Sequence, residues 1–327
     1  MKRLFVLSGL VLLCISCSAG PYSRWGTLHV EHRQLVDQKG EPVQLRGFST
    51  YNIAGFDWLF GLPQTKELSQ VWHADVLRIA MYTDSNQAGY VLDPQKGTVN
   101  PSLKQLVEKV IANTEKAGMY AILDWHILYD GDPMTNLQAA KTFFTEMAKR
   151  YRGDGHLMFE ICNEPNGSKV TWEGDIRPYA VQVLAAIRAI DPQRLVLVGT
   201  PNWSTEPAQV LADPLPDSQV LYVFHVYMDK GAELQAQALE ALKKVPLIVT
   251  EIGTTDSSGK GDIHPQKFQE WMNFLNQHKI SWCNWSLSTV AEGSAALQST
   301  YELNGPMKDH LSASGKLVLP FLAEPRN

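Results

Sequence analysis

The sequence has few cysteines, and those it has are poorly placed for a disulfide framework. Four occur among 327 residues: Cys14 and Cys17 near the N-terminus, and Cys162 and Cys283 inside apolar, strand-like runs. Small exported domains that rely on disulfides are much richer in cysteine. We therefore expect no disulfide framework, and we also expect no metal site and no cofactor.

An excess of basic charge is also missing. Lys and Arg number 29 against 34 Asp and Glu, which gives a formal net charge of -5. Nucleic-acid binding needs a basic surface, so a nucleic-acid partner is excluded and a neutral substrate is the easier expectation. Internal repeats and low-complexity linkers are absent from the sequence as well. We expect one domain of barrel size that acts as a monomer.

Only one long apolar run occurs, Leu4 to Ile15, and it follows two basic residues at the N-terminus. The run is too short to span a bilayer, and small residues follow it, which is typical of a secretory signal peptide. We predict a signal peptide over residues 1–19 and a mature catalytic chain over residues 20–327. That chain is expected to be secreted or periplasmic, without a transmembrane segment.

An alternative for the N-terminus is a lipid anchor at Cys17, which would then be the first residue of a lipoprotein. The three residues before it, Cys14-Ile15-Ser16, match the usual lipobox poorly. The signal peptide that is simply removed is therefore the leading interpretation.

Eight apolar segments recur at regular distances along the mature chain. They are residues 45–49, 75–82, 120–125, 157–162, 195–199, 220–226, 247–252 and 280–287. Continuous apolar runs of this length indicate parallel strands that are covered on both faces. Before the first of them, residues 25–37 and 42–47 predict a hairpin that turns at Lys39-Gly40-Glu41.

Helical patterns separate these predicted strands. One begins at Asn100-Pro101, an N-cap followed by proline, and ends near Gly118. Similar apolar spacing runs through residues 137–151, 176–190 and 265–275. Eight strand-then-helix units predict an α/β fold, a (β/α)8 TIM barrel preceded by a short hairpin. A doubly wound open sheet is the alternative.

Polar residues stand at the carboxyl ends of six of the predicted strands. They are Arg78, Asp124 with His126, Asn163 with Glu164, His225 with Tyr227, Glu251, and Trp285. Any one of them could be a structural polar residue with satisfied hydrogen bonds. In a barrel, however, all eight carboxyl ends meet at one rim, where active sites lie. The set as a whole therefore favours an active site over structure alone.

The two glutamates of this set suit glycoside hydrolysis with retention of configuration. That reaction needs one protonated and one ionised carboxyl group, roughly 5 to 5.5 Å apart. Pro165 restricts the backbone of Glu164, which suits a group with one fixed orientation. A buried Arg78 requires a carboxylate partner, and with Tyr227 it would favour the ionised form of Glu251. Glu164 would then be the general acid.

Three tryptophans fall at predicted rim positions, namely Trp58, Trp203 and Trp285. Flat rings with a polar edge suit the C–H faces of pyranose sugars. Ordinary loop packing is the alternative for Trp58 and Trp203.

On these motifs the sequence resembles glycoside hydrolase family 5, and within it the bacterial endo-β-1,4-glucanases. The similarity extends from Gly40 to Gly315. Its most specific parts are residues 78–82, 124–128, 160–167, 199–204, 225–227, 250–251 and 285–288. The resemblance implies a cofactor-free barrel enzyme whose substrate partner is a β-1,4-glucan polysaccharide or a cello-oligosaccharide.

By position, the resemblance also assigns roles to individual residues. It implies Glu164 as acid/base and Glu251 as nucleophile, with Arg78, His225 and Tyr227 around the nucleophile. It further implies Asn163 at the sugar 2-hydroxyl, and His126 and Trp285 at the cleavage subsite. A non-proline cis peptide between Trp285 and Ser286 is expected as well.

The sequence departs from the family pattern at three positions. Tyr51 stands where the family has a histidine, Val290 replaces a subsite lysine although Glu292 is kept, and Ile252 replaces a tryptophan after the nucleophile. The first two affect polar contacts to sugars on the non-reducing side. They make the substrate less certain than the reaction type.

The leading hypothesis is a retaining endo-β-1,4-glucanase that cleaves internal bonds of cellulose or mixed-linkage glucan. A first alternative is a retaining enzyme for another polysaccharide, such as mannan, xyloglucan or xylan. A second is a catalytically silent barrel that binds carbohydrate. A third, a metal-dependent barrel enzyme, is disfavoured because the strand ends offer no obvious carboxylate cluster beyond the pair.

Overall fold

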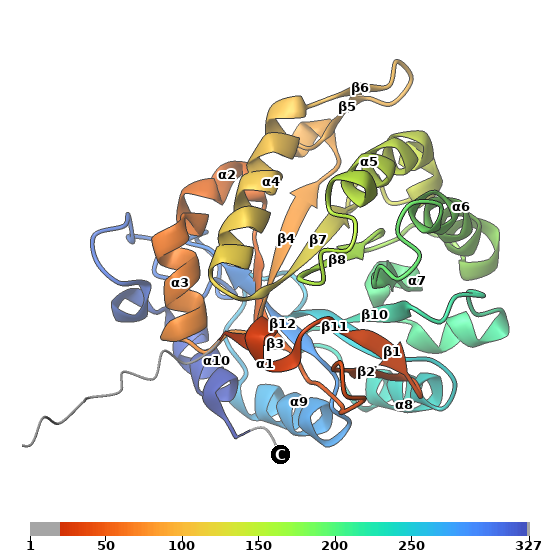
Figure 1. Cartoon of the computed structure of the whole chain (residues 1–327). Helices are drawn as coiled ribbons and strands as arrows, with labels where there is room; N and C mark the ends of the chain where they lie inside the picture. Colours follow the sequence, from red (N-terminus) through yellow and green to blue (C-terminus); the bar gives the residue numbers. More distant parts are fainter. Residues whose placement is uncertain (1–19, 326–327) are drawn as a thin grey trace, which may run out of the picture.

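A closed barrel of eight parallel strands forms the centre of the computed structural model, which describes residues 20–325 (Figure 1). The strands are β3 (Arg46–Thr50), β4 (Val76–Tyr82), β7 (Tyr120–His126), β8 (Leu157–Glu160), β9 (Val196–Gly199), β10 (Val220–Val226), β11 (Leu247–Ile252) and β12 (Trp282–Leu287). β12 pairs with both β11 and β3, which closes the sheet. The predicted (β/α)8 barrel is confirmed, and the open-sheet alternative is wrong.

Helices surround the barrel on its outer face (Figure 1). They are α2 (Ile53–Phe56), α3 (Leu62–Gln70), α4 (Pro101–Lys116), α5 (Leu137–Arg150), α6 (Arg177–Arg188), α8 (Ala232–Leu242), α9 (Pro265–Gln277) and α10 (Ala313–Ala323). The predicted start of α4 is confirmed, because the Asn100 side chain accepts a hydrogen bond from the Leu103 backbone N–H. None of the helices in the described part of the chain is both long and apolar enough to cross a membrane.

The unit after β9 differs from the regular pattern that the sequence predicts. In place of a long helix it has the four-residue α7 (Pro201–Ser204) and a 3-10 helix at Pro207–Ala212. Asn202, Trp203 and Ser204 all have positive φ angles, near 55°. Such left-handed backbone is unfavourable for residues other than glycine, so this turn is held by its surroundings.

Alternation along each strand separates the outer core from the barrel interior. In β7, Leu123 and Trp125 pack outward with the helices, while Ile122 belongs to the interior apolar cluster. Successive residues of a strand point to opposite faces, so Asp124 and His126 share the interior face with Ile122. The interior is therefore apolar near the strand starts and polar near their carboxyl ends.

A hairpin of β1 (His29–Glu31) and β2 (Gln34–Val36) covers the opposite, N-terminal end of the barrel, with the short α1 (Pro21–Trp25) before it. The predicted turn at Lys39-Gly40-Glu41 is present, and Val36 and Pro42 form an isolated antiparallel bridge across it. The hairpin of β1 and β2, however, reverses earlier than predicted, at His32 and Arg33, both with positive φ. Two-residue hairpin turns usually contain Asn or Gly. The His-Arg pair therefore gives no signal of a turn.

Two further features complete the described chain. A second small hairpin, β5 (Val91–Asp93) and β6 (Thr98–Val99), projects above α4 in Figure 1. Cys162 and Cys283 are buried free thiols. The predicted signal peptide over residues 1–19, and with it the alternative anchor at Cys17, lies outside the described residues.

Candidate active site

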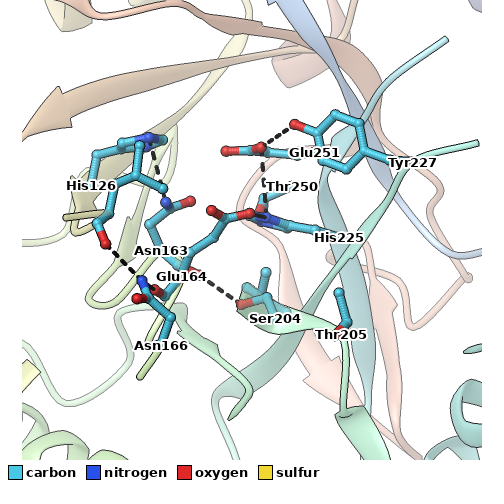
Figure 2. Close-up of polar contacts among 12 residues, drawn as sticks. His126, Asn163, Glu164, Asn166, Ser204, Thr205, His225, Tyr227, Thr250 and Glu251 are labelled. Atoms are coloured by element: carbon cyan, nitrogen blue, oxygen red, sulfur yellow. Dashed lines mark hydrogen bonds and ion pairs between the residues drawn. The ribbon is translucent and has the colours of Figure 1, made fainter. Parts of the chain in front are cut away.

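Glu164 and Glu251 face each other across His225 at the carboxyl-terminal rim of the barrel (Figure 2). Glu164 lies four residues after the end of β8, whereas Glu251 lies within β11. His225 Nδ1 is 2.7 Å from Glu164 Oε1 and 3.6 Å from Glu251 Oε2. One carboxylate oxygen of each glutamate lies within 4.8 Å of the other. The two carboxyl groups are therefore close enough for retention of configuration.

Glu251 is surrounded by hydrogen-bond donors. Arg78 Nη1 donates to its Oε1 at 2.9 Å, and the Tyr227 hydroxyl donates to its Oε2 at 2.6 Å. Both contacts favour the ionised carboxylate, because a protonated carboxyl could not accept so fully. The predicted pairing of Arg78 and Tyr227 with Glu251 is present in the structure.

Arg78 is fully buried and has more partners than the sequence analysis anticipated. It forms a bidentate pair with Glu160, with Nε–Oε2 and Nη2–Oε1 distances of 2.8 and 2.9 Å. Its Nη2 also lies 3.0 Å from Asp124 Oδ2 and 2.5 Å from Asn163 Oδ1. A guanidinium carries five donors in a fixed fork, so one residue can orient all of these groups.

The carboxylate cluster around Arg78 corrects one expectation. The strand ends do hold further carboxylates beside the catalytic pair, namely Asp124 and Glu160, both completely buried. Asp124 was among the polar residues predicted at the rim, but without a role of its own, and Glu160 was not predicted as a site residue. Each shares the interior face of its strand with apolar neighbours, and a charged residue at such a position was the available signal.

Burial shifts the pKa values of Glu164 and of three groups beside it. Burial raises the pKa of Glu164 to about 8, the positive Arg78 opposes this shift and Glu160 adds to it. Burial likewise raises the pKa of Asp124 to about 7. Burial lowers the pKa of His225 to about 4 and that of His126 to about 3. At neutral pH Glu164 is thus protonated, and both imidazoles are neutral.

His126, Asn163 and Trp285 lie next to the two glutamates. His126 Nδ1 contacts Asp124 Oδ2 at 2.6 Å, and its Nε2 lies 3.4 Å from the Asn163 side-chain nitrogen (Figure 2). The Trp285 ring is nearly parallel to the His126 ring, with centroids 5.4 Å apart. The predicted cis peptide between Trp285 and Ser286 is confirmed.

An open cleft of about 700 Å³ runs over the two glutamates. Its walls include His126, Trp285, Trp203 and Glu292 from the predicted set. Trp203 is 47% exposed, and its backbone N–H donates to the Pro165 carbonyl at 3.1 Å. The left-handed turn at α7 therefore ties this exposed ring to the segment that carries Glu164.

Trp58 is the predicted sugar platform that the structure does not bring into the cleft. It is not among the lining residues, and it is half-buried against the core with its ring 6.2 Å from that of Tyr301. For Trp58, the alternative of ordinary packing therefore fits better than a role as a sugar platform.

The three departures from the family pattern lie in different surroundings. Tyr51 lines the cleft, where its ring is 5.5 Å from that of Trp285, and Ile252 is completely buried in the core. Val290 is absent from the lining, whereas Lys260, on the loop after β11, contributes to it. Burial raises the pKa of Glu292, and the positive charge of Lys260 opposes that shift. A cleft lysine therefore faces Glu292 from another loop.

Two groups of three side chains within residues 20–325 have the spacing of metal ligands. One is Glu164, His225 and Glu251 themselves, and the other is Glu115, Asp154 and His156. In the first group, His225 Nδ1 is already at hydrogen-bond distance from Glu164. Metal independence stays a prediction.

A model of the family described as cellulase (glycosyl hydrolase family 5) matches residues 36–290. The chain belongs to glycosyl hydrolase family 5. Among its relatives in this family, endoglucanase N of Pectobacterium atrosepticum is 39% identical over 313 residues, which cover 95% of this chain and 68% of the relative. Endoglucanase 5 of Pectobacterium carotovorum subsp. carotovorum is 38% identical over 313 residues, which cover 95% of this chain but 60% of that protein.

Solved family 5 structures have the same barrel. A variant of the catalytic domain of Thermobifida fusca endoglucanase Cel5A, in complex with cellotetraose, matches with a TM-score of 0.85 at 34% sequence identity. The match covers 93% of this chain and 100% of that domain. The resemblance that the sequence analysis states is thereby confirmed.

Proposed function

We propose that this family 5 chain is a retaining endo-β-1,4-glucanase, with Glu164 as acid/base and Glu251 as nucleophile. The observation that carries the proposal is the pair of carboxyl groups within 4.8 Å of each other under an open cleft, one protonated and one held by cationic and phenolic donors. Relatives named endoglucanases, and a similar structure that holds cellotetraose, favour β-1,4-glucan as the substrate.

In the first step, Glu251 attacks the anomeric carbon while the glycosidic C–O bond breaks. Glu164 transfers its proton to the departing oxygen, which leaves as a neutral alcohol. The new ester removes the negative charge from Glu251. In the second step, Glu164 takes a proton from water, the water oxygen attacks the anomeric carbon, and the bond to Glu251 breaks. Both carboxyl groups then return to their starting states.

The remaining cleft residues bind and orient the sugar in this proposal. Asn163, fixed by Arg78 and by the Ile127 carbonyl, contacts the 2-hydroxyl. His126 and Trp285 line the cleavage subsite, and Trp203 stacks on a more distant sugar ring. Glu292 and Lys260 supply polar contacts further along the cleft.

Initial rates on a panel of soluble polymers test the substrate. Carboxymethyl-cellulose and mixed-linkage β-glucan should be cleaved faster than mannan, xyloglucan or xylan, with a rapid fall in viscosity that marks internal cleavage. Faster release from mannan would move the assignment to the first alternative polymer. Binding without release of reducing sugar would identify a silent carbohydrate-binding barrel. Proton NMR of the first product anomer tests retention.

We further propose that the mature chain, residues 20–327, is one catalytic domain that is exported after removal of residues 1–19. The apolar run after two basic residues supports export. Mass spectrometry of the protein from its native producer would identify a free N-terminus at Gly20, or instead a diacylglyceryl group on Cys17.

A further inference from the structure

A chain of four hydrogen-bonded side chains connects Glu160 to the acid/base residue. Thr250 Oγ1 is 2.9 Å from Glu160 Oε1 and 3.0 Å from His225 Nε2, and His225 Nδ1 is 2.7 Å from Glu164 Oε1. Thr250 and Glu160 are completely buried, so bulk water does not compete for these contacts. Figure 2 shows Thr250 behind His225. Neither Thr250 nor Glu160 has a role in the mechanism described above.

The hydroxyl proton of Thr250 has one favourable direction. Burial raises the pKa of Glu160 and Arg78 opposes this shift, but both Glu160 oxygens accept hydrogen bonds from Arg78, so Glu160 is bound as a carboxylate and can only accept. Thr250 therefore donates its single hydrogen to Glu160. Its oxygen is then left to accept, and within residues 20–325 the donor placed against it is His225 Nε2–H.

The position of that N–H determines what His225 offers to Glu164. A neutral imidazole carries one N–H, so a protonated Nε2 leaves Nδ1 as an acceptor. The lowered pKa of His225 keeps the ring neutral at neutral pH. At 2.7 Å from an acceptor nitrogen, Glu164 Oε1 must supply the hydrogen itself.

We propose that Thr250, anchored by Glu160, is a positioning residue that fixes the Nε2–H tautomer of His225 and thereby keeps the acid proton on Glu164. The opposite tautomer would place an N–H against Glu164 and stabilise its ionised form. It would also turn the Thr250 lone pairs toward Glu160 Oε1 at 2.9 Å, which is electrostatically unfavourable. The geometry therefore favours one arrangement of the protons along the four hydrogen-bonded side chains, from Glu160 to Glu164.

This arrangement of protons assists both steps of the proposed reaction. Its role in catalysis rests on that proposed function. After proton transfer to the departing sugar, the Glu164 carboxylate faces a lone pair of His225 and gains no N–H donor from it. It therefore stays basic enough to take a proton from water. Glu251, in contrast, keeps its own donors in Arg78 and Tyr227.

Other charged and titratable groups also act on this proton. Those facing Glu164 and His225 from the surrounding strands are Arg78 and Tyr82 of β4, Asp124 and His126 of β7, Glu160 of β8, Tyr227 after β10, and Glu251 of β11. A change at Thr250 replaces none of these residues; Glu160 loses its hydrogen bond from Thr250 but keeps both of its hydrogen bonds from Arg78.

The direct test reads the tautomer in the unaltered mature protein. Long-range proton–nitrogen NMR on protein labelled with 15N-histidine distinguishes protonated from unprotonated ring nitrogens, and the signal lost in His225→Asn identifies the residue. We expect a protonated Nε2 and an unprotonated Nδ1 at pH 6 to 7. A protonated Nδ1, alone or in an imidazolium, would overturn the proposal. This NMR measurement requires no catalytic turnover, so its outcome does not depend on which substrate the enzyme cleaves.

The functional test compares Thr250→Val with Thr250→Ser. Valine has nearly the same shape but neither donor nor acceptor, so His225 becomes free to protonate Nδ1 and stabilise ionised Glu164. The alkaline limb of kcat/KM should move about one pH unit toward acid in the valine variant. The serine variant should keep the parental profile. A uniform loss of activity in the valine variant, with an unmoved alkaline limb, would reduce Thr250 to a structural residue. If that variant does not fold, the tautomer measurement decides alone.

Discussion

The Tyr227 hydroxyl lies 2.6 Å from Glu251 Oε2 and donates its proton to it, while Arg78 holds the other oxygen of the same carboxylate. Glu164 has no comparable set of donors: it contacts His225 and keeps 12% of its side chain open to the cleft. The two neighbouring carboxyl groups therefore differ strongly in their hydrogen-bond donors, and burial raises the pKa of Glu164 to about 8.

Replacing Glu251 with Gln should abolish turnover while preserving binding. The amide keeps the shape and can still contact Arg78 through its oxygen, but it cannot form the covalent intermediate. We expect kcat on soluble glucan to fall by about six orders of magnitude, the scale seen when a covalent nucleophile is lost. Calorimetry with cello-oligosaccharide should show an affinity close to that of the parent. Turnover near the parental rate would remove Glu251 from the role of nucleophile.

Activity on the polymer should fall as the pH rises above about 8. Burial raises the pKa of Glu164 to about 8, so the acid keeps its proton below this pH and loses it above. A pH profile of kcat/KM measures the limb. A cellobioside with a dinitrophenolate leaving group is the control, because its first step needs no acid. If the alkaline limb persists with that substrate, a group other than Glu164 controls it.

Glu164→Gln should stabilise the fold at alkaline pH. A carboxyl group with a pKa raised in the folded state binds more protons there than when unfolded, so stability falls as pH rises between about 4.5 and 8. The amide never ionises and removes this penalty. We expect the free energy of unfolding to exceed that of the parent by on the order of 3 kcal/mol at pH 8, with a much smaller difference at pH 5. Urea titrations at both pH values measure it, and a difference independent of pH would contradict the assignment.

Trp203 and Trp58 form a matched pair for testing sugar stacking. Trp203→Ala removes an exposed ring from the cleft, so KM for cello-oligosaccharides should rise about tenfold while kcat changes little. Trp58→Ala removes a ring that packs beside Tyr301 outside the cleft lining. It should lower the melting temperature and leave KM unchanged. Equal effects of the two changes on KM would show that Trp203 has no special contact with the sugar.

The sequence alone determined the repeating strands, the rim on which the polar residues gather, and the identity of the two glutamates. These features are local. Strand composition follows from burial on both faces, helix starts follow from caps such as Asn100, and Pro165 restricts the backbone of Glu164, four residues after β8. The cis bond after Trp285 was predicted too, but through the family resemblance and not from the residues themselves.

Only the tertiary structure decided which polar groups meet. Arg78 is joined to Glu160, 82 positions later, and Thr250 to the same glutamate across 90 positions. Such contacts depend on how the barrel closes and on the register of its strands. No short segment of the sequence determines either of these. The same holds for Trp58, whose 3-10 helix (Asp57–Phe60) lies outside the cleft lining, and for Lys260, which the loop after β11 brings into it. The composition and the hydrophobic period of a segment predict which face of a strand or helix a side chain lies on. The packing of distant strands and loops determines which groups that side chain contacts.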